Sequence, residues 1–210
     1  MILVCSAWEE ETKYLDLCQD KFKIIQLGIG YLQAALNLQR FILKEREAEN
    51  GTLQHTSILG GRYSPRIEKI YFIGTAGLIS EADINWDVPV FSVNKVSLSL
   101  PLSLRKQAYV PKTYPQFSLR TSTELNVADC LSALEITTSS EISSEIEYRP
   151  LLENMELYGV AQVAEEFNIP CSALLGVTNR TDASAHKDWS SNHKKVSKLL
   201  CKYFSELVQD

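Results

Sequence analysis

The sequence is poor in the residues that build metal sites and disulfide frameworks. Its 210 residues include five cysteines and three histidines. No two cysteines form a Cys-x-x-Cys pair, and the histidines lack the spacing of metal ligands. We therefore expect no metal site and interpret the cysteines as reduced thiols of a cytoplasmic protein.

Features of membrane, secreted and nucleic-acid-binding proteins are also missing. No apolar run approaches the ~20 residues needed to span a bilayer. The apolar stretch at residues 1–7 has no basic segment before it and runs into three acids, so we interpret it as a strand and not as a signal peptide. A net charge of −5 argues against general nucleic-acid binding, which needs clustered Lys and Arg to neutralise phosphates.

The composition is that of a globular protein with one complete core. Hydrophobic residues make up 45% of the chain and charged residues 22%. A chain of this length can bury enough apolar surface to fold without further support. We expect a single domain that spans residues 1–210.

Apolar runs and helical periodicities alternate along the chain. They predict strands at residues 2–7, 22–27, 70–73, 88–93, 117–120, 134–138 and 171–177, and helices at residues 31–43, 158–167 and 192–207. We also expect a capped helix start at residues 122–129 and a polar loop at residues 44–68. Open α/β proteins bind ligands at the carboxyl ends of their strands.

Polar residues and glycines stand at several of these strand ends. Glu9 and Glu10 have a plain structural explanation, because carboxylates in a first helical turn interact favourably with the helix dipole. Glu156 opens a helix and Asn179 follows the last strand, so both are candidate site residues. The sequence Gly74-Thr75-Ala76-Gly77 ends the strand at 70–73 with small residues that let a ligand approach the backbone closely, and a plain tight turn is the alternative. No glycine pattern here predicts NAD or ATP binding.

Five motifs resemble those of the nucleoside phosphorylase/nucleosidase superfamily in order and spacing. They are Ser6-Ala7-Trp8-Glu9-Glu10-Glu11, Gly28-Ile29-Gly30, Gly74-Thr75-Ala76-Gly77, Asn154-Met155-Glu156 and Thr178-Asn179. The resemblance implies an α/β fold, a three-layer α/β/α sandwich with a mixed, partly closed central sheet. It also implies cleavage of the N-ribosidic bond of nucleosides. Within the superfamily the sequence is most similar to the hydrolases, namely methylthioadenosine/S-adenosylhomocysteine nucleosidase and futalosine hydrolase.

The same resemblance implies roles for individual residues. Glu11 would be the general base that activates water, and Glu156 would bind the ribose hydroxyls and steady positive charge on the sugar. The remaining substrate-binding candidates surround the sugar and the base: Thr75, Gly77, Asn154, Met155, Trp189 and, for stacking on the purine, Ile142. The resemblance implies a homodimer and neither a metal nor an organic cofactor.

Asn179 bears on the leaving group. Adenine-cleaving relatives resemble Ser-Asp at this position, and the aspartate protonates the base. An amide cannot act as a general acid, but it can donate to O6 and accept from a protonated N7. The spacing from Asn179 to Trp189 is similar to that of futalosine hydrolases. We therefore favour a 6-oxopurine leaving group such as hypoxanthine, and with it futalosine as substrate and a role in menaquinone biosynthesis.

Three alternatives stay open. A phosphorylase needs cationic groups for phosphate, and residues 28–39 and 74–80 contain no Arg or Lys, which favours water unless Arg62, Arg66 or Arg120 folds in. Methylthioadenosine or inosine can replace futalosine as the substrate. Because Tyr158 and Leu175 depart from the superfamily pattern, a non-catalytic nucleoside-binding relative with a closed pocket is the third alternative.

Overall fold

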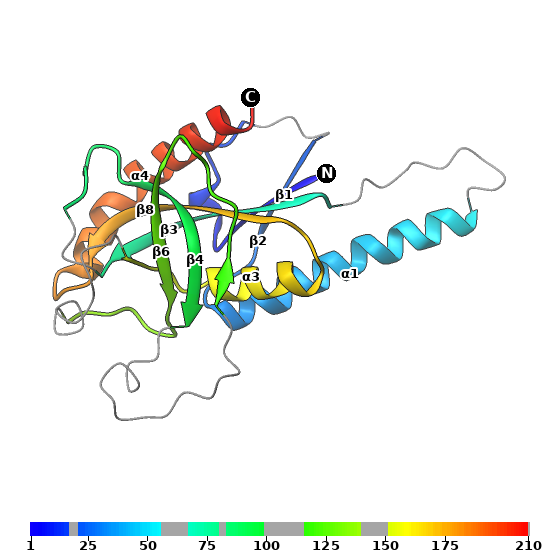
Figure 1. The fold of residues 1–210 in the computed structure, drawn as a ribbon, viewed down its shortest axis with the longest axis horizontal. Coiled ribbons are helices and arrows are strands. Elements are labelled where there is room, and N and C mark those ends of the chain that lie inside the picture. Colours follow the sequence, from blue (N-terminus) through cyan, green and yellow to red (C-terminus); the bar gives the residue numbers. More distant parts are fainter. Residues whose placement is uncertain (17–20, 56–66, 80–82, 99–115, 140–150, 210) are drawn as a thin grey trace.

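The structure is a computed structural model that describes residues 1–16, 21–55, 67–79, 83–98, 116–139 and 151–209 (Figure 1). Ile142, Arg62 and Arg66 lie outside these residues, so the expectations placed on them have no structural counterpart. Among the described residues, none of the helices combines the length and the apolar character that crossing a membrane requires.

One mixed sheet contains all the described strands. Its order is β2 (Phe22–Gln26), β1 (Ile2–Ser6), β3 (Lys69–Leu78), β7 (Leu151–Glu153), β6 (Asn126–Ser132), β4 (Val90–Leu98) and β5 (Phe117–Ser118). The eighth strand, β8 (Cys171–Arg180), pairs in parallel with β3 and antiparallel with β4. The sheet thereby closes on itself through β3, β7, β6, β4 and β8, while β1 and β2 extend from it. The predicted mixed, partly closed sheet is confirmed.

Helices cover both faces of this sheet. On one face α1 (Tyr31–His55) packs against α3 (Leu157–Glu166), and α4 (Ala185–Leu207) covers the other (Figure 1). The inward stripe of α4 contains Val196, Leu200 and Phe204, which are buried at helical spacing. The three-layer α/β/α arrangement is confirmed.

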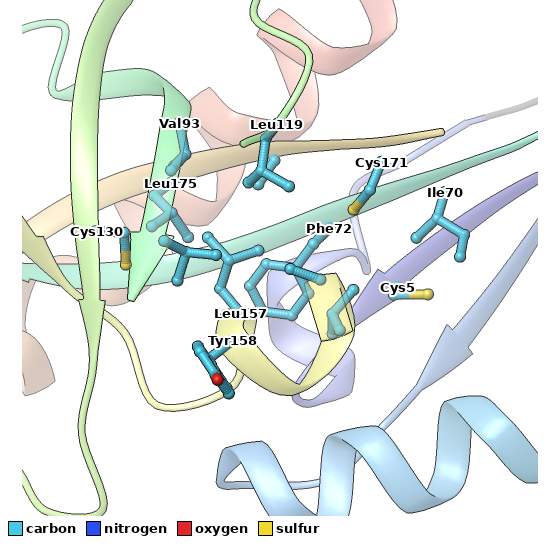
Figure 2. Close-up of a cluster of buried hydrophobic side chains, with 14 of the residues drawn as sticks. Cys5, Ile70, Phe72, Val93, Leu119, Cys130, Leu157, Tyr158, Cys171 and Leu175 are labelled. Atoms are coloured by element: carbon cyan, nitrogen blue, oxygen red, sulfur yellow. The ribbon is translucent and has the colours of Figure 1, made fainter. Parts of the chain in front are cut away.

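Side chains of β3 alternate between the two cores. Ile70 and Phe72 belong to the larger apolar cluster under α1 and α3, whereas Tyr71 and Ile73 pack in the cluster under α4. This follows from the two-residue period of a strand. Figure 2 shows Phe72 among the buried side chains that face α3. Burial on both faces explains why the strand reads as a continuous apolar run.

Two elements are longer than the sequence predicted. The loop expected at residues 44–68 is wrong in its first part, because α1 continues to His55. In the described part of this extension, residues 44–48 are exposed or half-buried, and Lys23 pairs with Glu45 at 2.8 Å. The strand end expected at residue 73 is also wrong, and so is the alternative of a tight turn, because residues 74–77 lie inside β3, which runs to Leu78. Pairing with β8 keeps this stretch extended despite its small residues.

Three further predictions are corrected by the sheet. Residues 126–132 form β6, parallel to β4, where a helix start was expected. Residues 134–138 form no strand, although the pattern predicted one. The last helix begins at Ala185 rather than near residue 192, because the apolar stripe used to place it starts only in its second half. Long-range pairing with β4 and β7 decided the first case, and local propensity does not encode such pairing.

Candidate active site

A cavity of about 360 Å³ lies at the carboxyl ends of β1, β3 and β8. Neighbouring parallel strands end at one edge of a sheet, so their terminal residues meet there. The start of α3 and the first turns of α4 complete the walls. The lining residues are Ala7, Trp8, Glu11, Ile29, Thr75, Ala76, Gly77, Ile136, Glu153, Asn154, Met155, Glu156, Asn179, Ala185, His186 and Trp189.

Glu11 is held at the floor of the cavity by β1 and β3. It closes a short 3-10 helix, Glu9–Glu11, that follows β1. Its Oε2 accepts a hydrogen bond from the Ala7 N–H at 3.0 Å, and its Oε1 accepts from the N–H and the hydroxyl of Thr75 at 2.8 and 3.0 Å. The side chain is buried. Burial raises the pKa of Glu11 to about 7, and the nearby charge of Glu156 adds to the rise.

Glu156 comes to the cavity from the start of α3. Its Oε1 accepts from the Gly30 N–H at 2.9 Å and its Oε2 from Asn154 Nδ2 at 3.1 Å. Gly30 has φ of +88°, a conformation that side chains disfavour, and this turn aims its N–H at the carboxylate. Burial raises the pKa of Glu156 as well.

Asn154 orders the start of α3 and links it to β3. Its Oδ1 accepts from the N–H groups of Glu156 and Leu157 at 3.0 and 2.9 Å, as a capping side chain does. Its Nδ2 donates to the carbonyl of Thr75 at 3.0 Å in addition to Glu156. The two buried carboxylates are therefore connected through Thr75 and Asn154, which fixes their relative position.

A bulge in the pairing of β8 with β3 sets the direction of Asn179. Ala76 pairs with Val177 and Gly77 with Asn179, so Thr178 is the extra residue. Such an insertion reverses the alternation of side chains along the strand. The Thr178 hydroxyl lies 2.7 Å from Asn179 Oδ1, and Asn179 Nδ2 donates to the Arg180 carbonyl at 2.9 Å. One N–H and one acceptor position of the amide remain for a ligand.

Aromatic rings gather on one wall of the cavity. Trp189 on α4 stacks on His193 with ring centroids 4.8 Å apart. The centroid of the Trp8 ring lies 6.0 Å from that of Trp189. His186 stacks on Trp189 from the preceding turn at 5.9 Å. Because α4 begins seven residues earlier than predicted, Trp189 lies on a helix and not in a loop.

Comparisons with known proteins find structures of similar fold. A family model described as the phosphorylase superfamily matches residues 139–209. The structure resembles a futalosine hydrolase mutant of Helicobacter pylori, with a TM-score of 0.72, 17% identity and coverage of 99% of this chain and 98% of that one. A putative 5′-methylthioadenosine/S-adenosylhomocysteine nucleosidase of Borrelia burgdorferi bound to adenine gives a TM-score of 0.71, 18% identity and coverage of 100% and 99%. The chain has the nucleosidase fold.

The corresponding nucleosidase of Neisseria meningitidis, solved with methylthio-immucillin-A, is similar with a TM-score of 0.69, 16% identity and coverage of 99% and 97%. Among curated proteins, none matches the sequence significantly. The predicted resemblance to the superfamily is confirmed.

The cavity of this nucleosidase fold brings together most of the residues that the sequence singled out. Lining it are Glu11, Thr75, Gly77, Asn154, Met155, Glu156, Asn179 and Trp189. Glu9 and Glu10 point elsewhere: Glu9 is exposed, and Glu10 forms an ion pair with Lys13 at 2.7 Å.

Several lining residues escaped the sequence analysis. Trp8 lies inside the first of the five motifs and Glu153 directly precedes the fourth, and these positions were the available signal. Ile136 and His186 carried none, because the segment of Ile136 was read as a strand and the start of α4 was placed too late. All four depend on how the chain folds around the cavity.

Tyr158 and Leu175 do not close the cavity. Both are buried in the apolar cluster on the α3 side of the sheet, where Figure 2 shows them. The Tyr158 ring packs against Phe117 and Tyr31 at 5.1 and 6.1 Å. Arg120 is exposed, and no Arg or Lys is among the described residues that line the cavity.

Proposed function

We propose that the protein is a nucleosidase that hydrolyses the N-ribosidic bond of a purine nucleoside with a 6-oxopurine leaving group. The observation that carries the proposal is the pair of buried carboxylates, Glu11 and Glu156, in one cavity with the Asn179 amide. Breaking an N-glycosidic bond leaves an oxocarbenium-like sugar and an electron-rich base. Such a reaction needs anions at the sugar and hydrogen-bond donors at the base.

Glu11 is proposed as the general base that takes a proton from the attacking water. A general base works best when its pKa lies near the working pH. The buried carboxylate of Glu11 has a pKa of about 7. Its hydrogen bonds to Ala7 and Thr75 hold it in one orientation, which supports catalysis by positioning.

Glu156 is proposed to bind the ribose hydroxyls and to stabilise the positive charge that develops on the sugar. Its carboxylate is buried, and in a water-poor site a fixed anion acts more strongly on a developing cation than it would in solvent. Met155, beside it on the cavity wall, is placed to contact the ribose.

Asn179 is proposed to hold the leaving base. The N–H and the acceptor position that its internal hydrogen bonds leave over match O6 and a protonated N7 of a 6-oxopurine. Hypoxanthine is such a base, and futalosine is the most specific substrate we propose. The absence of Arg and Lys among the described lining residues favours water over phosphate as the nucleophile.

We further propose that the protein acts as a homodimer in the cytoplasm. Leu32 and Leu36 on α1, and Ile29 in the turn before it, have exposed fractions of 64%, 44% and 67%. Ile29 also lines the cavity, so a second copy seated on this face would cover the cavity mouth. The four described cysteines are free thiols, as is usual in a reducing compartment. Sedimentation of wild type against Leu32→Lys tests the dimer: the variant is expected to be monomeric, and a monomeric wild type refutes it.

The decisive experiment measures base release from futalosine, inosine, adenosine and methylthioadenosine, with and without phosphate. Hypoxanthine release without phosphate is the expected result. Adenine release would overturn the role of Asn179, and strict phosphate dependence would identify a phosphorylase. Release of no base by folded protein would favour a non-catalytic nucleoside-binding protein.

A further inference from the structure

A third buried carboxylate, Glu153, lines the cavity beside the two proposed to act in catalysis. It ends β7, where it pairs with Gly77 of β3 and Leu131 of β6, and its exposed fraction is 6%. Its Oε2 accepts from the Thr137 N–H at 3.0 Å, and its Oε1 accepts from the Thr137 hydroxyl at 2.6 Å. Both oxygens are thus engaged by one residue.

Thr137 belongs to a segment without regular secondary structure. Residues 133–139 follow β6 and form neither strand nor helix. Ile136, the residue before Thr137, lines the cavity although 54% of its surface is exposed. No described sheet pairing or helix includes this wall, and the bidentate contact with Glu153 ties it to the end of β7.

Each of the three carboxylates accepts from the backbone of a different wall segment. Glu11 binds the N–H of Thr75, Glu156 that of Gly30, and Glu153 that of Thr137. Hydrogen bonds to charged acceptors are about twice as strong as neutral ones. Burial raises the pKa of Glu153, and the two hydrogen bonds from Thr137 oppose that rise. They favour the charged form that accepts both bonds.

We infer that Glu153 is a positioning residue that holds Ile136 against the bound substrate through Thr137. The role rests on the proposed function, because its effect is measured on turnover. Glu153 acts on substrate binding and not on bond cleavage, because its two hydrogen bonds go to the wall segment that carries Ile136. Releasing the segment leaves Glu11, Glu156 and Asn179 in place and removes one apolar wall.

The test compares Thr137→Val with Thr138→Val, steady-state kinetics being measured on the nucleoside that wild type hydrolyses. Thr138 is the exposed neighbour of Thr137, so its substitution is a matched control. Thr137→Val keeps the N–H and loses the hydroxyl. We expect KM to rise about tenfold, the typical weight of one hydrogen bond to a charged group, with kcat changed less than about twofold. Thr137→Ser restores the donor and is expected to restore KM.

Glu153→Gln supplies a second variant, with a KM at least as high as that of Thr137→Val. Thr137→Val with the KM of wild type, or with a lower kcat and an unchanged KM, overturns the positioning role alone. Equal effects of Thr137→Val and Thr138→Val also overturn it. A wild type without turnover on any nucleoside overturns the proposed function, and with it this role, so the two failures are distinguishable.

Discussion

Replacing Glu11 with glutamine removes a carboxyl group whose ionised form is disfavoured by burial in the folded protein. Its pKa is about 7 in the folded state against an ordinary value of 4.5. Because the folded state binds the proton more tightly, Glu11 contributes stability that is fully present below pH 4.5 and is lost as the pH rises through 7. The shift of about 2.5 pKa units corresponds to about 3 kcal/mol.

We expect the free energy of unfolding to depend more steeply on pH in wild type than in Glu11→Gln. Urea unfolding from pH 4 to pH 8 gives the free energy of unfolding of both proteins. Wild type should lose about 3 kcal/mol more than the variant over this range. Glu153 and Glu156, whose pKa values burial also raises, are present in both proteins, so the comparison isolates Glu11. The slope matters more than the absolute difference, because glutamine cannot reproduce both hydrogen-bonded oxygens.

The same substitution has an expected effect on turnover. Loss of a general base typically lowers the rate by ~10²–10⁴-fold. In wild type, kcat/KM should fall below about pH 7 as Glu11 becomes protonated, and the residual activity of Glu11→Gln should lack this acid limb. Parallel stability curves, or an unchanged acid limb in the variant, would refute the assignment of the raised pKa and of the base to Glu11.

Three further predictions concern the site and the helix layer. Glu156→Gln should lower kcat by ~10²–10³-fold, since it removes transition-state charge stabilisation; a variant that changes only KM contradicts that role. Asn179→Asp should shift the ratio of kcat/KM from hypoxanthine release towards adenine release, measured on inosine and adenosine, and an unchanged ratio speaks against base recognition at this position. Gly159→Ala should destabilise the protein by ~3 kcal/mol or more, because a Cβ there would lie 2.0 Å from the Tyr31 carbonyl oxygen. Thermal unfolding against exposed Glu165→Ala is the control, and equal melting temperatures would rule out that close contact.

The strands and helices that build the layers follow from local signals, whereas the three-layer arrangement and most of the cavity residues were implied by the resemblance to the superfamily. The continuous apolar run of β8 and the periodicity of α3 are visible in any short window. The carboxylates Glu11 and Glu156 stand at the ends of helices, and such positions can be recognised in the sequence. Residues 126–132 were misread since their strand character comes from pairing with β4, a partner about thirty residues away.

Geometry inside the site was out of reach for a related reason. Asn179 faces the cavity because of a one-residue bulge against β3, and a register shift has no signature in the sequence of either strand. The raised pKa of Glu11 follows from burial by distant segments, and the bond between Glu153 and Thr137 joins residues across a stretch that patterns alone could not place.

The close contact between α1 and α3 lies beside the Glu156 carboxylate of the candidate site. Gly159 meets the backbone of Tyr31, the first residue of α1, and within one turn of that point Glu156 accepts from Gly30. Moving α1 away from α3 would therefore lengthen the hydrogen bond from the Gly30 N–H to the Glu156 carboxylate, which lines the cavity. A bulky side chain at this helix contact is thus expected to disturb the Glu156 carboxylate without entering the cavity.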